Sequence, residues 1–273
     1  MSTDASPANT PLTAEQLERA HLRYDVDGAT ALITLDRPEV RNAQTPTMWR
    51  TLAAIGAQLP DDVRVVIVRG AGHTFSAGLD RNLLMPGAGP GEESVADLIP
   101  RSDQEIADTI AEYQAGFTWL RDPRIVSIAV VDGYAIGAGF QLALSCDLIL
   151  AADDATFCMK ESALGLVPDL TGTKPLVERV GYPRALEICA TARNVGAEEA
   201  ARIGLVLDAV PSDRLDEALG DLLAALSAPL PDAVRETKAL LLGAAGRDLE
   251  TQCRLEREAQ ARRFREMAAL LGS

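Results

Sequence analysis

The sequence has few of the residues on which many kinds of site depend. Its 273 residues include two histidines, His21 and His73, so a histidine-based metal site or a Ser-His-Asp triad has little material. The four cysteines lack the close pairing of a zinc or disulfide framework, and most of them lie in apolar surroundings. They are Cys146, Cys158, Cys189 and Cys253. We therefore expect no metal, and a chain that stays reduced in the cytoplasm.

Positive charge and long apolar runs are also scarce. Forty acidic residues outnumber 26 lysines and arginines, for a formal net charge of -14, which argues against nucleic acid and anionic membranes as partners. No apolar run approaches the roughly 20 residues of a membrane span. The opening MSTDASPANTP has neither the basic nor the apolar region of a secretory signal. We expect residues 1–20 to form a disordered arm.

What the sequence does contain is an alternation of apolar strands and helices. Its apolar fraction of 47% is sufficient for a large core. The alternation continues to residue 210, and from Ser212 onward the pattern is helical, which predicts a core over residues 21–210 and a helical region over 211–273. The expected core elements are strands at 22–26, 29–35, 64–68, 126–131 and 205–210, and helices from Pro46, from Ser102, at 176–181 and at 182–190.

The most informative stretch runs over residues 130–172. An apolar strand ends at Asp132-Gly133, and Gly137-Ala138-Gly139 opens a second apolar segment. The same order of strand, glycine turn and helix occurs at 64–84. Two such turns can place backbone N–H groups at the mouth of one pocket. Residues 86–100 are rich in glycine and proline, which predicts a mobile surface loop near that pocket.

Four segments carry a resemblance to a known family. FSAGLD at 75–80 and GYAIGAGFQLALSCDLILAADDATF at 133–157 resemble the paired signatures of the enoyl-CoA hydratase/isomerase, or crotonase, superfamily. DRPEVRNAQ and ARIGLVLDAV are similar to its flanking motifs. The resemblance implies an α/β fold of the ClpP/crotonase type, a spiral of ββα units with a C-terminal helical trimerisation region, and a homotrimer or homohexamer.

The resemblance also implies the substrate and the polarising groups. The substrate would be an acyl-CoA thioester, and no cofactor is needed beyond the coenzyme A that the substrate carries. The backbone N–H groups of Leu79 and Ala138 would form the oxyanion hole, each stabilising the developing enolate by about 3 kcal/mol. The phosphates of coenzyme A need cations. Residues near the matched motifs and one in the helical region are the predicted CoA ligands, although each could equally be a solvated surface charge: Arg37, Arg41, Arg81 and Lys238.

Three residues are the predicted catalytic set. Hydratases of this family use two glutamates around a water, and those positions match Gln141 and Glu161 here. Because an amide cannot take a proton from water near neutral pH, hydration lacks one of its two groups. Asp169 follows Glu161 by eight residues in KESALGLVPD, a spacing that resembles the dienoyl-CoA isomerase branch. The favoured reaction is therefore double-bond isomerisation of an enoyl- or dienoyl-CoA, with Glu161 and Asp169 as acid and base.

Four points stay open. The protein could be a 2-enoyl-CoA hydratase in which Gln141 orients a water. It could be a non-catalytic acyl-CoA-binding member of the family. Asp169 could be only a turn residue that follows Pro168. Lys160 could either be a solvated neighbour of Glu161 or lower its pKa.

Overall fold

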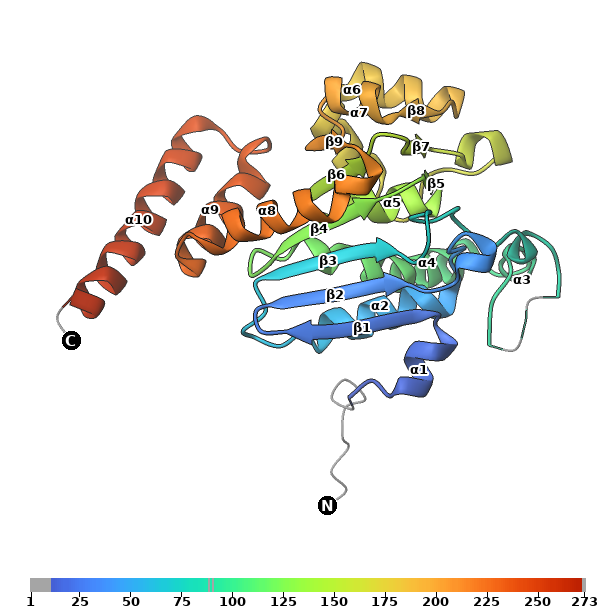
Figure 1. Ribbon diagram of the computed structural model, residues 1–273. Helices are drawn as coiled ribbons and strands as arrows, with labels where there is room; N and C mark the ends of the chain where they lie inside the picture. Colours follow the sequence, from blue (N-terminus) through green and yellow to red (C-terminus); the bar gives the residue numbers. More distant parts are fainter. Residues whose placement is uncertain (1–10, 88, 90, 272–273) are drawn as a thin grey trace.

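A six-stranded sheet forms the centre of the protein (Figure 1). The computed structural model describes residues 11–87, 89 and 91–271. The strand order is β1-β2-β3-β4-β6-β9; β1 and β2 form the predicted antiparallel hairpin, and all other neighbours are parallel. The strands are β1 (Leu22–Asp27), β2 (Thr30–Leu35), β3 (Val65–Gly70), β4 (Val126–Val131), β6 (Leu148–Ala152) and β9 (Asp208–Val210).

Both faces of this sheet are buried, which explains its continuously apolar strands. Val66 and Val68 of β3 belong to the larger core, whereas Val65 and Ile67 point to a smaller one on the opposite face. The larger core includes residues of α2 (Pro46–Ala57), α4 (Asp103–Thr118) and α5 (Ala138–Ser145). α8 (Leu215–Ser227) covers the opposite face. The first long helix of the predicted C-terminal region therefore packs on the core sheet.

A smaller sheet holds the second glycine turn beside the first. It contains β5 (Tyr134–Ile136), β7 (Thr156–Cys158) and β8 (Val195–Gly196). A parallel bridge between Ser76 and Ala135 joins it to the segment that follows β3. The remaining elements of the core are short or lie on the surface: η2 (Pro38–Val40), η3 (Arg81–Leu84), η4 (Trp119–Arg121), η5 (Glu161–Leu164), α6 (Thr173–Thr191) and α7 (Ala197–Arg202).

Two segments that were predicted to lack secondary structure contain short helices. The expected disordered arm includes α1 (Ala14–Arg19), whose Thr13 and Gln16 form a capping box; residues 1–10 lie outside the described part. The expected mobile loop contains α3 (Val95–Leu98), also with a capping box, from Ser94 and Asp97. Both helices are too short to stand out by periodicity, and each depends on its cap. The loop prediction for residues 86–100 is therefore wrong over α3.

One other prediction needs a smaller correction, and two are confirmed. The strand expected over 205–210 is limited to β9. The two helices expected on either side of position 181 are confirmed: the segment labelled α6 is broken at Gly181, whose φ of 72° and ψ of 160° are not helical. Ser102 and Glu105 form the capping box that begins α4, as the sequence predicts. Local signals located this helix start well because the cap is built from neighbours in sequence.

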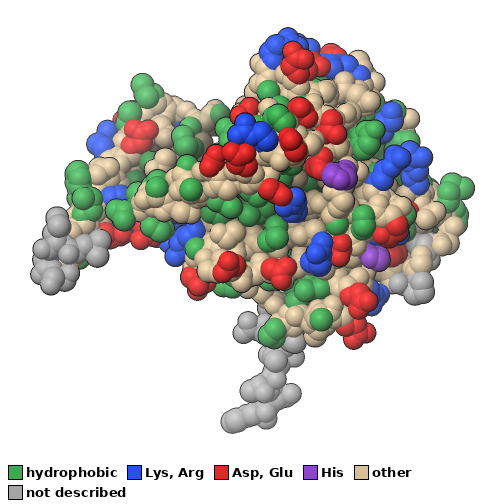
Figure 2. All heavy atoms as spheres, viewed as in Figure 1, with side chains coloured by type: hydrophobic (Ala, Val, Ile, Leu, Met, Phe, Trp, Pro, Cys, Tyr) green, Lys and Arg blue, Asp and Glu red, His purple; other side chains and the backbone are tan. Residues whose placement is uncertain are grey.

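The last helix, α10 (Leu249–Leu271), projects from the core. α9 (Pro231–Ala244) and α10 follow η6 (Ser212–Arg214) and α8, and Figure 1 shows α10 away from the central sheet. On the face shown in Figure 2, acidic and basic side chains are interspersed, and hydrophobic ones lie on the projecting part. Large apolar side chains of α9 and α10 are exposed in the single chain, among them Leu241, Leu249, Phe264 and Met267. Within the described ranges, no helix combines the length and apolar character needed to cross a membrane.

Candidate active site

The two glycine turns approach each other more closely than side chains would allow. A Cβ atom on Gly78, which has φ 87°, would lie 2.5 Å from the Ile136 carbonyl oxygen. A Cβ on Gly139 would lie 2.6 Å from the Ser76 carbonyl oxygen. Glycine at both positions is therefore required for the backbones that follow β3 and β5 to meet.

Leu79 and Ala138, one from each glycine turn, line a common cavity. Gln44 pairs with Leu79 in a parallel bridge, in which Gln44 N donates to Gly78 O (2.8 Å) and Asp80 N donates to Gln44 O (2.9 Å). Such a bridge uses the flanking peptide groups, so the N–H of Leu79 points away from Gln44. Ala138 is the first residue of α5, where an N–H has no acceptor within the helix.

A cavity of about 710 Å³ opens beside these two residues, and both of them line it. Most of its walls are apolar, as is usual for a site that takes a hydrophobic group. The apolar walls come mainly from α2, η3, α3 and α4. Six polar side chains also line it: Arg81, Glu93, Gln141, Lys160, Glu161 and Asp169. The structure thus brings the predicted oxyanion residues and all three predicted catalytic residues together.

Gln141 is bound at both ends of its amide. Its Oε1 accepts hydrogen bonds from Leu170 N (2.8 Å) and Gly172 N (3.2 Å), and its Nε2 donates to Glu161 Oε1 at 2.6 Å. Because two backbone donors face the oxygen, the nitrogen must face the glutamate. The side chain is 1% exposed. Gln141 therefore joins Glu161 to the turn that carries Asp169, rather than offering its carbonyl to a water.

Glu161 has one satisfied and one unsatisfied oxygen. It is 8% exposed; Oε1 accepts from Gln141, whereas Oε2 is buried without a partner among the described residues. Burial raises the pKa of this carboxyl, and the charge of Asp169 raises it further.

Asp169 is the second carboxyl of the cavity. Burial raises its pKa also. Its backbone oxygen accepts a hydrogen bond of 2.6 Å from Gln114 Nε2 of α4. The turn that carries Asp169 is thus held from two sides, by Gln114 and by Gln141. Such fixation is what an acid–base residue needs, since a small displacement from its target proton lowers the rate.

The predicted CoA ligands do not form one group. Arg81 lines the cavity, and the Arg41 guanidinium lies 5.8 Å from the centre of the Tyr134 ring. Arg37 Nη1 lies 2.6 Å from Asp80 Oδ2, an aspartate whose other oxygen caps η3. Arg37 therefore supports the first glycine turn.

Lys238 has a different position from the one predicted. It is buried in α9, and its Nζ donates to Asp122 O (2.8 Å), Ile125 O (2.7 Å) and Asp147 Oδ2 (2.6 Å). An ammonium group has three N–H donors, and all three are used. This placement contradicts the prediction that Lys238 binds CoA: it fastens α9 to the core.

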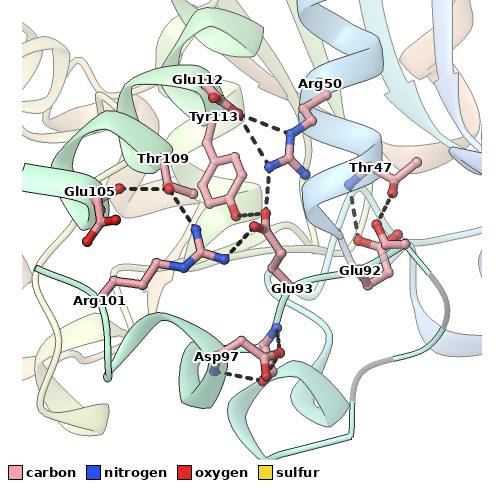
Figure 3. A network of polar contacts seen from close by, with 12 residues as sticks. Thr47, Arg50, Glu92, Glu93, Asp97, Arg101, Glu105, Thr109, Glu112 and Tyr113 are labelled. Carbon is pink, nitrogen blue, oxygen red and sulfur yellow. Dashed lines mark hydrogen bonds and ion pairs between the residues drawn. The ribbon is translucent and has the colours of Figure 1, made fainter.

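Sequence reasoning missed one group of cavity residues. Glu93, from the segment predicted as a loop, lines the cavity and binds side chains from α2 and α4 (Figure 3). Its partners Arg50 and Tyr113 lie far from it in sequence, so no local sequence pattern predicts these contacts. In the part of the chain that the structure describes, no cluster of potential metal ligands occurs.

The fold and the paired backbone donors define an enzyme of the crotonase superfamily. The enoyl-CoA hydratase/isomerase family model matches residues 25–269, and the chain belongs to this family. Among sequence relatives, the "Probable enoyl-CoA hydratase" of Rhodobacter capsulatus is 35% identical over 70% of this chain and 68% of its own length. The human mitochondrial Delta(3,5)-Delta(2,4)-dienoyl-CoA isomerase is 36% identical over 77% of this chain and 64% of its own.

Solved structures give the same assignment. A Thermobifida fusca YX protein, described as a "putative enoyl-CoA hydratase", was solved in complex with acetoacetyl-CoA. It is 51% identical, with a TM-score of 0.89 over 93% of this chain and 98% of that chain. The structure of that protein with CoA has a TM-score of 0.91 over 96% of this chain and 99% of that chain. The fold is therefore the crotonase fold, as the sequence predicts.

Proposed function

We propose that the protein isomerises a double bond of an enoyl- or dienoyl-CoA. The observation that carries the proposal is the contact between Gln141 and Glu161. An amide occupies the place of the second glutamate of hydratases and is bound to Glu161 and to backbone, so it cannot remove a proton from water. Asp169, in the same cavity, provides the second proton-handling group. The likeness to the human dienoyl-CoA isomerase supports this choice.

The thioester carbonyl would lie between the N–H groups of Leu79 and Ala138. Each donor stabilises an enolate oxygen by about 3 kcal/mol in comparable sites. The acetoacetyl-CoA bound to the Thermobifida fusca protein supports an acyl-CoA in the corresponding cavity here. A structure of this protein with an acyl-CoA tests the placement. We expect hydrogen bonds from both donors to the carbonyl oxygen; separations of more than about 3.5 Å from both would contradict it.

The reaction would move one proton out and one proton in. The base breaks a C–H bond of the acyl chain, and the electron pair moves through the conjugated system to the thioester oxygen, giving an enolate. The acid then returns a proton to a different carbon, the enolate collapses, and the double bond has shifted. No water is consumed, so a cavity with apolar walls favours this chemistry over addition.

We propose Asp169 as the base and Glu161 as the acid. Burial raises the pKa of both carboxyls, and the unpartnered Oε2 of Glu161 is the oxygen that would hold the proton. Gln141 holds Glu161 in place through Oε1.

A 2-enoyl-CoA hydratase is the second candidate. It is favoured by the retained Glu161 and by the names of relatives such as the Rhodobacter capsulatus protein. Assays of purified protein with straight-chain, dienoyl and cyclic CoA esters test both candidates. We expect conjugated enoyl- or dienoyl-CoA products. Turnover of none of these esters would favour a non-catalytic acyl-CoA-binding protein and overturn the proposal.

The proposal extends to CoA and to assembly. Arg81, which lines the cavity, and Arg41, whose guanidinium lies over the Tyr134 ring, are the proposed phosphate ligands. The exposed apolar side chains of α9 and α10 are proposed to be buried between subunits of a homotrimer or homohexamer, since a lone chain rarely leaves such a surface in water. A mass measurement in solution tests this, and a monomer at micromolar concentration would contradict it.

A further inference from the structure

One wall of the cavity is held in place without a hydrophobic core of its own. We name residues 92–101 the chamber wall; it contains α3, and Val95, Leu98 and Ile99 line the cavity. Only Ser94 in this range is buried, and Ile99 is 74% exposed. Apolar packing therefore contributes little to its position, and polar contacts must fix it.

Glu93 supplies the central contact. Its carboxylate accepts hydrogen bonds from Arg50 Nη2 (2.5 Å) of α2, from the Tyr113 hydroxyl (2.8 Å) of α4, and from Arg101 Nη2 (2.8 Å) at the other end of the wall (Figure 3). Three charge-assisted hydrogen bonds to one carboxylate define both its position and its orientation. Glu93 thus joins the wall to α2 and α4, and its bond to Arg101 connects the two ends of the wall.

The contacts around Glu93 strengthen this attachment. Glu92 Oε2 accepts from Thr47 N (3.1 Å), and Arg101 Nη1 donates to Thr109 Oγ1 (3.1 Å). The Tyr113 ring packs against Trp49 with ring centres 5.0 Å apart, so the donor hydroxyl is itself rigidly held. The wall is therefore joined to α2 and α4 by side-chain hydrogen bonds.

We propose that Glu93 is a specificity-determining residue, which sets acyl-chain preference by fixing the chamber wall against the acyl group. The inference rests on the proposed acyl-CoA site. The polar coenzyme does not suit the apolar side of the cavity, so the acyl chain lies there. Each methylene that a fixed apolar wall removes from water strengthens binding by up to about fourfold. If the wall is loosened, acyl chains long enough to reach it lose this gain in binding affinity.

The test is a binding series with saturated acyl-CoA esters, which report on the cavity without turnover. Affinities of acetyl-, butyryl-, hexanoyl- and octanoyl-CoA are measured by calorimetry for the wild type and for Glu93→Gln, which keeps the shape and removes the charge. We expect affinity to rise with chain length in the wild type. In Glu93→Gln we expect octanoyl-CoA to bind at least tenfold more weakly, with acetyl-CoA within about threefold of wild type.

Glu112→Gln is the matched control, because Glu112 is an exposed partner of Arg50 and lies outside the wall. We expect it to keep the wild-type dependence on chain length. Arg101→Gln is the second variant. It removes the partner of Glu93 within the wall, so it should also weaken the binding of octanoyl-CoA more than that of acetyl-CoA. Faster amide exchange over residues 95–101 in Glu93→Gln would support the proposal.

Three outcomes would overturn the proposal. One is the same chain-length dependence in Glu93→Gln, or in Arg101→Gln if Glu93→Gln does not fold. The second is an equal change in Glu112→Gln. The third is failure of every ester to bind the wild type, which would remove the proposed acyl-CoA site as well.

Discussion

Gln141 Nε2 donates a hydrogen bond of 2.6 Å to Glu161 Oε1, so an amide and not a second carboxyl faces Glu161. Hydration needs two groups that handle protons of a water molecule. The amide of Gln141 handles none, but it fixes Glu161 and, through Leu170 N and Gly172 N, the turn next to Asp169. The residue that weakens the case for hydration is thus the one that aligns the two carboxyls proposed for isomerisation.

Replacing this amide by a carboxyl should restore hydration. In Gln141→Glu one carboxyl oxygen keeps the hydrogen bonds from the two backbone donors. The other carboxyl oxygen faces Glu161 Oε1, close enough for the two carboxyls to share one proton. We expect hydration of crotonyl-CoA to rise by about 10²-fold, the lower end for one acid–base group. The measurement is the rate of 3-hydroxyacyl-CoA formation, with Gln104→Glu, at an exposed glutamine of α4, as the control. No gain would show that the amide does not limit hydration.

Removing the proposed base should stop turnover without stopping binding. Asp169→Asn keeps the shape of the side chain, and the backbone contact of Asp169 with Gln114 does not depend on the carboxyl. We expect kcat for isomerisation to fall by roughly 10²–10⁴-fold and acyl-CoA affinity to change little. Asp153→Asn, an exposed carboxyl, is the control. Full activity of Asp169→Asn would leave Asp169 as a turn residue.

Lys238 should matter for stability and not for CoA. Lys238→Met leaves two backbone carbonyls and the Asp147 carboxylate without their buried cation. We expect the free energy of unfolding to fall by about 3–5 kcal/mol, as when one partner of a buried pair is removed. Denaturant unfolding measures this, and Lys174→Met, whose ammonium is exposed, serves as the control. A stable variant with weakened CoA binding would restore the prediction that Lys238 is a CoA ligand.

Glu93 should give the protein an acid-sensitive contribution to stability. Burial alone would raise its pKa, but hydrogen bonds from Arg50, Arg101 and Tyr113 outweigh burial and lower the pKa from 4.5 to about 2. A lowered carboxyl pKa stabilises the fold above its unfolded value, and this stabilisation is lost as pH falls from about 4.5 through about 2. Because the Glu93 side chain is still 25% exposed, solvent screens its ion pairs, and the contribution is smaller than that of a fully buried pair.

Unfolding of the wild type and Glu93→Gln from pH 7 to pH 2 measures that contribution. We expect the wild type to be more stable at pH 7 and the difference to shrink as pH falls. A difference that is constant with pH would show that the charge of Glu93 contributes nothing.

The sequence predicted those parts of the site that depend on local backbone geometry. Gly78 and Gly139 lie where only glycine allows two turns to meet, and this requirement is visible as a motif. It also predicted the start of α4, since Ser102 and Glu105 cap it from within a few residues. What it missed depends on distant partners. The chamber wall looks like a loop in sequence because Arg50 and Tyr113, which hold Glu93, come from other helices. Lys238 looked like a surface cation for the same reason.

The most direct test of the account compares two rates on one enzyme. Wild-type protein is given a 3-enoyl- or 3,5-dienoyl-CoA in one assay and crotonyl-CoA in the other, and conjugated and hydrated products are separated and quantified. Because Gln141 cannot serve as a base and Asp169 lines the cavity beside Glu161, we predict that isomerisation exceeds hydration by at least about 10²-fold in kcat/KM. Hydration as fast as isomerisation, or faster, would contradict the account and assign the site to a hydratase that works with one glutamate.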